Sequence, residues 1–340
     1  PNFKMFRAGL QMRSTTFNGH DSDLKLISCG VPQGSLLGPL LFILYINDLR
    51  NSSQILSFIC FADDSNVFFS HRDPQTLINI MNNELNLVQS WIRANKLSLN
   101  IEKTNFMLFS NSLRVLPNHI RINDNNLCQV DTTKFLGLHI DKELTWKTHI
   151  NYLSKILSRN AGILNKLKHF FPTYILQTIY LSLISPYLNY GILAWGNTTT
   201  VLLDVLFRVQ KRAIRIINRT GYLSHTDNLF HQNRILKIAD LFNYNVGIFM
   251  YNLSVGELPD VFLHMFRRNS GVHNYPTRQR DAFHLPRTRT LFAQKTIMFT
   301  GPRFWNGLPP EITSCLAASS FKRNLKDFLL DGYSRIQQTD

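Results

Sequence analysis

Two adjacent carboxylates, Asp63 and Asp64, are the residues of this sequence best suited to chemistry. They follow the apolar run Ile55–Phe61 and precede a second β-forming run, Asn66–Ser70. Neighbouring carboxylates repel each other, and Mg²⁺ relieves this repulsion because it prefers carboxylate oxygens together with water and phosphate. Two such ions about 3.5–4 Å apart can hold the attacking and leaving oxygens of phosphoryl transfer. Asp also favours ordinary turns, so the pair gains meaning only from its context.

The residues around this pair predict the elements that hold it. A turn-rich loop, Gly30–Ser35, leads into a helix that begins near Pro39 and ends at about Leu49. This helix is apolar on every face, so we expect it to be buried. The two β-forming runs predict a hairpin with a turn at Ala62–Ser65.

The following residues predict a helix and several short strands. Asp73 is a predicted N-cap and Pro74 the first helical residue, and the apolar positions after them recur every 3.6 residues. The predicted strands are Leu97–Ile101, Phe106–Phe109, His119–Asn123, Leu127–Val130 and Phe135–Ile140.

The hydrophobic period changes near Trp146 and divides the chain. Residues 1–145 mix helical and strand patterns, whereas residues 146–260 keep a helical period. Residues 261–340 mix Pro, Gly, Arg and aromatics without period, apart from a helix at Ser319–Leu330. We therefore predict an α+β fold with a mixed domain, a mainly α-helical region and an irregular basic tail.

The positive charge is concentrated in the second part of the chain. The 340 residues carry a net charge of +15, from 37 Lys and Arg against 22 Asp and Glu. Residues 1–150 contain 14 basic and 12 acidic side chains, whereas residues 151–340 contain 23 and 10. This asymmetry favours chemistry in the first part and polyanion binding in the second.

Cysteine spacing and hydropathy exclude other classes. The four cysteines are far apart and form no CxxC pair, so neither a zinc module nor a disulfide framework is expected. The uncharged stretch Phe170–Leu203 contains two prolines and several polar residues, which favours buried helices over a membrane span.

A cationic stripe is predicted on the helix Leu202–Thr220. On a helical wheel its basic residues fall within about 100° of one another, beside an apolar face. They are Arg208, Lys211, Arg212, Arg215 and Arg219. Such a stripe could be a solvated surface, but five cations without an acid among them favour contact with a phosphate backbone.

Several motifs in a fixed order make this sequence resemble the reverse transcriptases of non-LTR (LINE-type) retrotransposons. These motifs are Gly30–Ser35, Leu37–Phe42, Tyr45–Leu49, Phe61–Asp64, Asn100–Thr104, Phe135–Leu138 and Gly301–Asn306. The resemblance covers nearly the whole chain. It implies a partial right-hand polymerase palm at 1–145, a helical thumb-like region at 146–260 and a basic C-terminal region at 261–340.

The resemblance also implies roles for individual residues. Asp63 and Asp64 would be catalytic metal ligands of the palm, for two Mg²⁺ ions in the complete enzyme. Gln33 and Gly34 would line the nucleotide pocket, and Lys103 would lie near the nucleotide phosphates.

A primer-gripping hairpin is implied for Phe135, Leu136 and Gly137. The basic stripe would belong to a thumb that holds the RNA template and DNA primer while dNTPs are added. The resemblance further implies an intracellular ribonucleoprotein, found in the nucleus and cytoplasm.

One feature departs from the family pattern. The family has a further metal-binding Asp on an apolar strand, several tens of residues before the Pro-Gln-Gly loop. Only 29 residues precede Gly30, and the acids among them, Asp21 and Asp23, lie in a polar segment. We therefore expect the C-terminal part of a polymerase, which binds Mg²⁺ weakly and is inactive without the N-terminal part of its polyprotein.

A second hypothesis needs no catalysis. Arg residues alternate with aromatic residues between Phe266 and Phe304, a pattern that suits RNA binding but equally suits a packed core. The chain could thus be an RNA- or DNA-binding remnant that acts through its basic thumb and tail.

Overall fold

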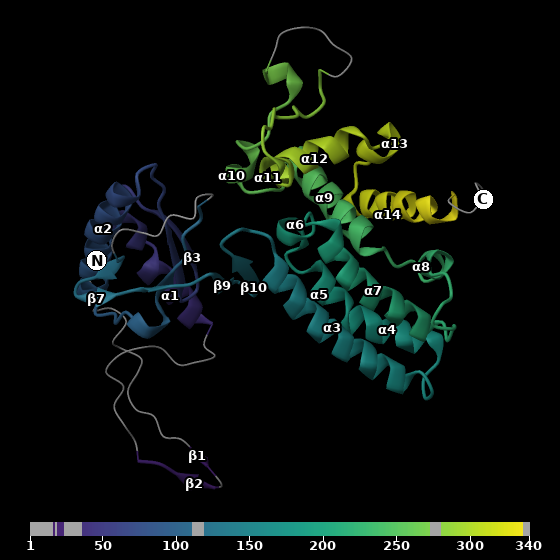
Figure 1. The fold of residues 1–340 in the computed structure, drawn as a ribbon, viewed down its shortest axis with the longest axis horizontal. Helices are drawn as coiled ribbons and strands as arrows, with labels where there is room; N and C mark the ends of the chain where they lie inside the picture. Colours follow the sequence, from purple (N-terminus) through teal and green to yellow (C-terminus); the bar gives the residue numbers. More distant parts are fainter. Residues whose placement is uncertain (1–15, 18, 24–35, 111–118, 273–279, 336–340) are drawn as a thin grey trace. The chain divides into compact units, whose positions relative to one another are not determined.

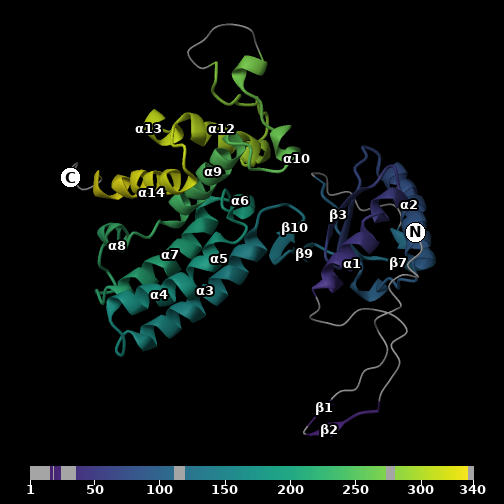
Figure 2. The same ribbon diagram turned by 180° about the vertical axis from the view of Figure 1, so that it is seen from behind.

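Two units divide the chain after Val130 (Figures 1 and 2). Their hydrophobic cores are separate, with two small clusters in the first unit and one large cluster in the second. The computed structural model describes residues 16–17, 19–23, 36–110, 119–272 and 280–335. The secondary structure is mixed α and β, mostly helical with small two-stranded sheets, which agrees with the predicted α+β class.

The first unit, residues 1–130, combines short strands with one long helix. Its elements are β1 (Thr16–Phe17), β2 (His20–Asp21), α1 (Leu37–Ile46), η2 (Leu49–Ser52), β3 (Ser57–Phe61), β4 (Asp64–Phe68), α2 (Pro74–Ala94), η3 (Ile101–Lys103), β5 (Asn105–Phe106), β6 (Arg121–Ile122), β7 (Asn125–Asn126) and β8 (Cys128–Gln129). The pairs β1–β2, β3–β4 and β6–β7 are antiparallel, and β5–β8 is parallel.

The second unit, residues 131–340, is a helical assembly that begins with one hairpin. Its elements are β9 (Thr132–Phe135), β10 (Leu138–Asp141), α3 (Lys147–Leu167), α4 (Thr173–Leu183), α5 (Ser185–Asn189), α6 (Ile192–Trp195), α7 (Thr200–Ile217), α8 (Asp227–Gln232), α9 (Ile238–Ser254), α10 (Asp260–Leu263), η4 (Asn269–Gly271), α11 (Leu291–Gln294), α12 (Ile297–Asn306), α13 (Pro310–Thr313) and α14 (Ala318–Arg335).

Helix α2 organises the first unit. Asp73 caps it as predicted, since its Oδ2 accepts hydrogen bonds from Thr76 N at 2.7 Å and Thr76 Oγ1 at 2.6 Å. The hydroxyl of Thr76, and then its N–H, hold the pKa of Asp73 below its usual range. Two small cores form along the helix, one around Ile78 and Leu85 and one around Val88.

The prediction of a buried helix at 39–49 is wrong. Helix α1 forms, but none of its residues is buried, and Leu40, Ile43 and Leu44 are all more than half exposed. Uniform apolarity predicts burial only where neighbours cover every face of a helix, and here only one face is partly covered: Leu41, Phe42 and Tyr45 are half-buried, and the Tyr45 hydroxyl donates to Asn95 O at the end of α2. Ile46 alone packs against the core around Val88.

Several predicted strands also differ from the structure. Leu97–Ile101 contains no strand and leads into η3, and the strand predicted at Phe106–Phe109 is limited to β5. Of the strands predicted at His119–Asn123 and Leu127–Val130, the first contains β6, which pairs with β7 across residues 123–124, whereas the second contains β8, which pairs with β5 and not with β6. Short polar strands of this kind obtain their partners from distant residues, which local periodicity does not reveal.

Helices α3 and α7 run parallel in the second unit, with their ends in register. At the N-terminal ends, Thr198 Oγ1 donates to Thr145 O at 2.9 Å, and at the C-terminal ends Arg219 Nη2 donates to Lys168 O at 3.1 Å. Leu157, Leu164 and Leu206 lie in the single core between the helices of this unit.

The uncharged stretch 170–203 forms short helices, as predicted. Leu176, Tyr180 and Trp195 from α4 and α6 are fully buried in the same core. No helix within the described residues is long and apolar enough to cross a membrane.

The helix predicted at Ser319–Leu330 is confirmed by α14, but the prediction of an irregular tail is wrong for residues 291–313, which contain α11, α12 and α13. Helices α12 and α14 lie against α9 (Figure 1), and Trp305 and Phe321 are buried in the common core. A Cβ added to Gly301 would lie 2.7 Å from Met250 Sδ, so this glycine permits the close crossing of α12 over α9. Pro302 and Gly301 obscure the helical pattern in the sequence, yet tertiary packing stabilises the helix.

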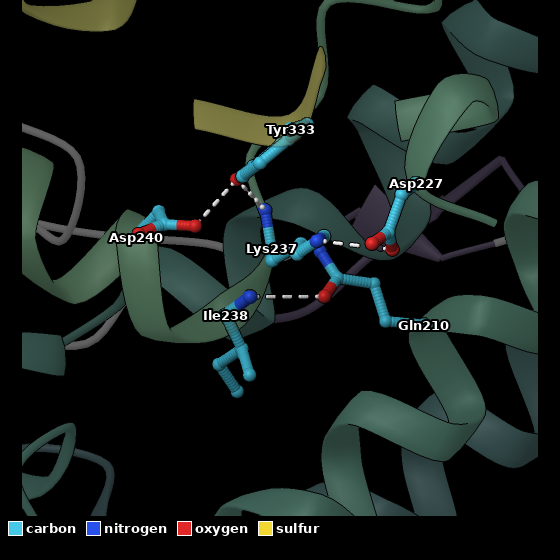
Figure 3. A network of polar contacts seen from close by, with 6 residues as sticks. All are labelled: Gln210, Asp227, Lys237, Ile238, Asp240 and Tyr333. Carbon is cyan, nitrogen blue, oxygen red and sulfur yellow. Dashed lines mark hydrogen bonds and ion pairs between the residues drawn. The ribbon is translucent and has the colours of Figure 1, made fainter. Parts of the chain in front are cut away.

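A buried glutamine joins α7 to the start of α9 (Figure 3). Gln210 is 2% exposed, and its Nε2 donates to Tyr180 Oη at 3.0 Å and to Leu236 O at 2.9 Å. Its Oε1 accepts from Ile238 N at 3.0 Å. Two of these three hydrogen bonds hold the chain turn before α9, and the third joins α7 to Tyr180 of α4.

Tyr333 connects the C-terminal helix α14 to the same turn (Figure 3). Its hydroxyl donates to Asp240 Oδ2 at 2.6 Å and accepts from Lys237 N at 2.9 Å, and Lys237 pairs with Asp227 at 3.0 Å. Burial raises the pKa of Asp240. The last described helix is thus part of the helical unit.

The N-terminus of α3 depends on a buried carboxylate. Asp141 accepts hydrogen bonds from Thr145 N at 2.8 Å and from Trp146 N at 2.7 Å. One turn into the helix, His149 is 2% exposed, and its Nδ1 accepts from His139 N at 3.4 Å. Its Nε2 has no hydrogen-bond partner among the described residues and lies in a ring of aromatics that includes Trp195, 5.7 Å away between ring centroids.

We predict that Gln210→Met strongly destabilises the helical unit. The substitution nearly conserves volume but leaves Leu236 O and Ile238 N buried without partners, at about 1–3 kcal/mol each. Thermal unfolding followed by circular dichroism measures the effect. The control is Gln294→Met at the exposed end of α11, expected to change stability by less than about 0.5 kcal/mol. Equal effects of the two substitutions would contradict the role given to Gln210.

Acidification should destabilise the same unit through His149. Burial, and then the neighbouring His139, lower the pKa of His149 from 6.5 to about 4. The unfolded chain therefore takes up a proton near pH 6.5 that the folded chain takes up only near pH 4, so stability falls over this window. The loss is roughly 3 kcal/mol, at about 1.4 kcal/mol per pH unit.

Unfolding measured between pH 7 and pH 4 checks this dependence. His149→Phe should remove most of the pH dependence, while His225→Gln, at an exposed loop position, should leave it unchanged. An unaltered pH profile in His149→Phe would show that another group is responsible.

Candidate metal centre and nucleic-acid interface

The acidic pair lies on a tight β-hairpin. Phe61 of β3 pairs with Asp64 of β4, so the connecting loop consists of Ala62 and Asp63. Ala62 has φ +49° and Asp63 is not in the positive-φ region, a pattern of turns that match the twist of hairpin strands. The predicted four-residue turn is therefore shorter in the structure, and Asp64 already belongs to a strand.

The two faces of this hairpin have different surroundings. Phe58 and Val67, paired across the strands, pack against the core around Val88 of α2. The other face carries Ile59, Phe61 and Asp64, all exposed. Asp64 therefore lies beside apolar residues on an open face of the hairpin, and Asp63 is exposed at its tip.

Ser53 and Glu84 hold the start of the hairpin. Ser53 Oγ donates to Glu84 Oε2 of α2 at 2.5 Å and accepts from the N–H groups of Ile55 and Leu56. Sequence reasoning missed this connection, since the two residues are 31 positions apart. Only the Ser-containing turn before the strand hinted at it.

Asp63 and Asp64 are the two residues of the predicted metal site, and the structure describes both of them. Within the described residues, no group of three His, Cys, Asp or Glu side chains could hold a metal ion. Asp63 and Asp64 suit Mg²⁺ in charge and donor type, and their exposure leaves room for water and phosphate ligands. The two carboxylates would therefore supply some of the ligands of a bound Mg²⁺ ion.

The predicted nucleotide-binding residues lie in different parts of the chain. Gln33 and Gly34 are outside the described residues. Lys103 is exposed at the end of η3, where Asn100 Oδ1 accepts its backbone N–H at 3.2 Å. No ion pair joins Lys103 to either aspartate in the described part of the chain.

Phe135, Leu136 and Gly137 form the end of a hairpin, so the continuous strand predicted at Phe135–Ile140 is wrong. Phe135 pairs with Leu138, and Leu136 (φ +46°) with Gly137 (φ +83°) makes the two-residue loop. Positive φ at both positions is the pattern of a type I′ turn.

Tyr190 holds this turn. Its hydroxyl donates to Leu136 O at 2.5 Å, and a Cβ on Gly137 would lie 3.3 Å from its ring. The hairpin belongs to the helical unit, where β10 packs against α3. Sequence analysis missed Tyr190, which is 54 residues away from Leu136.

The predicted cationic stripe separates into two groups. Arg208 and Arg212 are exposed on α7 and form no ion pair among the described residues. Lys211 is half-buried, with its Nζ 4.7 Å from the centroid of Phe207. No acidic side chain pairs with these three residues in the described part of the chain, so their charges are available to a phosphate backbone.

Arg215 and Arg219 have structural contacts. Arg215 Nε donates to Ser224 O at 2.9 Å. Helix α7 ends at Ile217, so Arg219 lies beyond it, and its guanidinium binds the carbonyls of Lys168 and Phe171. The wheel placed both residues on a free face because it contained no information about the loops that fold back onto the helix end.

Helix α3 adds further exposed cations. Lys155, Arg159 and Lys166 lie on the side of α3 opposite the buried residues Leu157 and Leu164. No Asp or Glu occurs between Glu143 and Asp204 or between Asp204 and Asp227, so both helices contribute positive potential with little compensation.

Part of the chain is similar to a known protein family. Residues 2–140 match the model of the reverse transcriptase (RNA-dependent DNA polymerase) family. The matched segment includes the Asp63–Asp64 hairpin and the Leu136–Gly137 turn. No solved structure matches the chain.

Curated relatives extend the similarity beyond that segment. The RNA-directed DNA polymerase from mobile element jockey of Drosophila funebris is 26% identical over 237 residues, which are 67% of this chain and 26% of the relative. The probable RNA-directed DNA polymerase from transposon X-element of Drosophila melanogaster is 25% identical over 260 residues, 72% of this chain and 27% of the relative. The chain thus spans about a quarter of the length of these relatives. Residues 2–140 are thus similar to reverse transcriptases, and the chain is similar to the polymerases of non-LTR retrotransposons.

Proposed function

We propose that this chain is part of an RNA-directed DNA polymerase that copies the RNA of a non-LTR retrotransposon into DNA. In this proposal residues 1–145 contribute part of the palm, residues 146–260 the thumb and residues 261–340 a basic C-terminal region. The observation that carries it is the exposed Asp63–Asp64 pair on a two-residue hairpin turn, inside the segment that matches the reverse transcriptase model.

Asp63 and Asp64 would hold Mg²⁺ in the complete polymerase. Bound Mg²⁺ would stabilise the charge that develops on the phosphoryl oxygens during nucleotidyl transfer. The chain's own contribution is to present two adjacent carboxylates on a rigid turn, with one face of the hairpin fixed to α2. A further carboxylate, implied by the family pattern, would complete the site, so we expect these two alone to bind the ion weakly.

The other residues would position the substrates. Gln33, Gly34 and Lys103 would contact the incoming dNTP, with Lys103 near its phosphates. The turn at Leu136–Gly137 would contact the primer end, and the hydrogen bond from Tyr190 supports this role because it fixes the backbone of the turn.

The exposed cations of α7 would bind the template–primer duplex. Arg208 and Arg212 are one helical turn apart, a spacing at which both can reach phosphates of one strand. Arg215 and Arg219 would support this surface by holding the loops at the helix end.

A second candidate is binding of RNA or DNA without catalysis. The absence of acids between Glu143 and Asp204 favours it independently of the aspartate pair, since this basic region needs no metal. The two candidates differ in what they require of Asp63 and Asp64.

We predict that Asp63→Asn abolishes polymerisation in an extended protein. The chain is fused to the preceding polymerase segment of the Drosophila funebris jockey relative, and Mg²⁺-dependent primer extension is measured on an RNA template. Loss of a metal ligand should reduce the rate at least about a hundredfold. Asp124→Asn is the matched control, since Asp124 is an exposed residue in the two-residue loop of another hairpin.

Full activity of the Asp63→Asn protein would refute the catalytic role. Should the unsubstituted fusion bind nucleic acid but fail to extend primers, the second candidate would be favoured. The chain alone, titrated with Mn²⁺ and followed by water-proton relaxation, should lose its weak binding in the doubly substituted Asp63→Asn, Asp64→Asn variant.

Replacing Arg208 and Arg212 together by Ala should weaken duplex binding and reduce its salt dependence. Removing one phosphate-binding cation lowers the slope of log K against log salt by about 0.9. Fluorescence anisotropy of a labelled RNA–DNA hybrid at several salt concentrations measures both quantities. Lys322→Ala with Arg323→Ala removes two exposed cations of α14 and serves as the control; an equal slope change there would make the effect nonspecific.

A further inference from the structure

Exposed aromatic side chains gather at the C-terminal ends of α3 and α7. We name residues 168–174 and 218–224 the helix-end surface; Figures 1 and 2 show both segments at the same end of α3, α4 and α7. Phe170 is 79% exposed, Tyr174 66% and Tyr222 80%. Because these three rings are so exposed, they contribute little to the hydrophobic core. Core packing therefore does not explain why aromatic residues occur at these positions.

Two arginines hold this surface together. Arg219 Nη2 donates to Lys168 O at 3.1 Å and to Phe171 O at 2.8 Å, which joins the α3–α4 loop to the end of α7. Arg215 Nε donates to Ser224 O at 2.9 Å and folds the following loop back onto the helix. The exposed rings are therefore carried by loops with fixed backbones.

The backbone of Arg219 has a left-handed conformation, which is strained for a residue other than glycine. Thr220 N donates to Arg215 O and Arg219 N to Ile216 O, the pattern of a Schellman motif, with φ +53° at Arg219. Glycine occupies this position without strain. An arginine at this position carries a conformational cost, and its guanidinium makes the contact that joins the two loops.

Tyr222 is prepared for stacking on one side. The guanidinium carbon of Arg215 lies 5.9 Å from the centroid of its ring, and most of the ring remains exposed. Lys168 belongs to the first of these segments, and Lys166 lies within one turn of it along the chain. No acid interrupts residues 144–203 or 205–226, so the surface combines aromatic faces with uncompensated positive charge.

We propose that the helix-end surface binds single-stranded nucleic acid. Unpaired bases would stack on Phe170, Tyr174 and Tyr222, while the neighbouring cations contact the phosphates. This combination of exposed rings and basic groups is how single strands are bound without sequence preference. Duplex bases have no exposed faces for such stacking, so this site is distinct from the duplex contact assigned to Arg208 and Arg212.

The test compares single strands with a duplex on the full chain. Anisotropy is measured with labelled 12-nucleotide oligo-U, oligo-dT and an RNA–DNA hybrid. The triple variant Phe170→Leu, Tyr174→Leu, Tyr222→Leu retains apolar area but removes the aromatic faces. Single-strand affinity should fall at least about fivefold per ring, with an unchanged salt slope and unchanged hybrid affinity.

Controls separate this site from folding and from the proposed polymerase function. Tyr187→Leu, at an exposed ring of α5, should leave single-strand binding intact, and circular dichroism verifies that each variant is folded. Arg219→Gly permits the same backbone conformation but removes the hydrogen bonds to the α3–α4 loop, so it should also weaken single-strand binding. Loss of hybrid binding in Arg208→Ala, Arg212→Ala with retained oligo-U or oligo-dT binding would support two separate sites.

Two results would overturn the proposal. One is wild-type affinity of the triple variant for both oligo-U and oligo-dT. The other is binding of the wild-type chain to phosphatidylserine–phosphatidylcholine vesicles but to neither oligonucleotide, which would assign the rings to a lipid surface. Tighter binding of oligo-U than of oligo-dT would support RNA as the strand, through its 2′-hydroxyl groups, and the reverse order would support DNA.

Discussion

The parallel packing of α3 on α7 is the interaction on which the helical unit depends. Both ends of the pair are closed by hydrogen bonds, from Thr198 to Thr145 O and from Arg219 to the carbonyls of Lys168 and Phe171. The β9–β10 hairpin packs against the start of α3, and the helix-end surface forms where both helices stop. The register of two helices thus positions a hairpin at one end and an aromatic, basic surface at the other.

The first unit carries the two adjacent carboxylates, Asp63 and Asp64. Both residues lie at the end of a hairpin with a two-residue turn, where they are exposed to solvent. This exposure limits the repulsion between their negative charges. Helix α2 covers one face of the hairpin, whereas Ile59 and Phe61 on the other face remain exposed, as do the apolar residues of α1. Apolar exposure beside the acidic turn is consistent with the proposal that this segment works within a larger polymerase.

Local patterns were sufficient wherever the determining residues are neighbours in sequence. The β3–β4 hairpin, the Asp73 cap and the long helices α2, α3 and α7 were predicted correctly, since turns, caps and amphipathic periods involve residues within a few positions. The errors concern distant partners. The turn at Leu136–Gly137 is held by Tyr190, and α12 is helical because Gly301 allows close packing on Met250 of α9.

The sequence by itself determined the similarity to reverse transcriptases, through the ordered motifs around Asp63–Asp64, and it determined the excess of positive charge over residues 151–340. Tertiary structure decided which of the basic residues are available. Arg208 and Arg212 are exposed and form no ion pair among the described residues, while the half-buried Arg215 and the exposed Arg219 donate to the carbonyls of loops next to the end of α7. The physical reason is that a helical wheel contains only one helix, whereas the carbonyls that compete for a guanidinium come from segments brought close by folding.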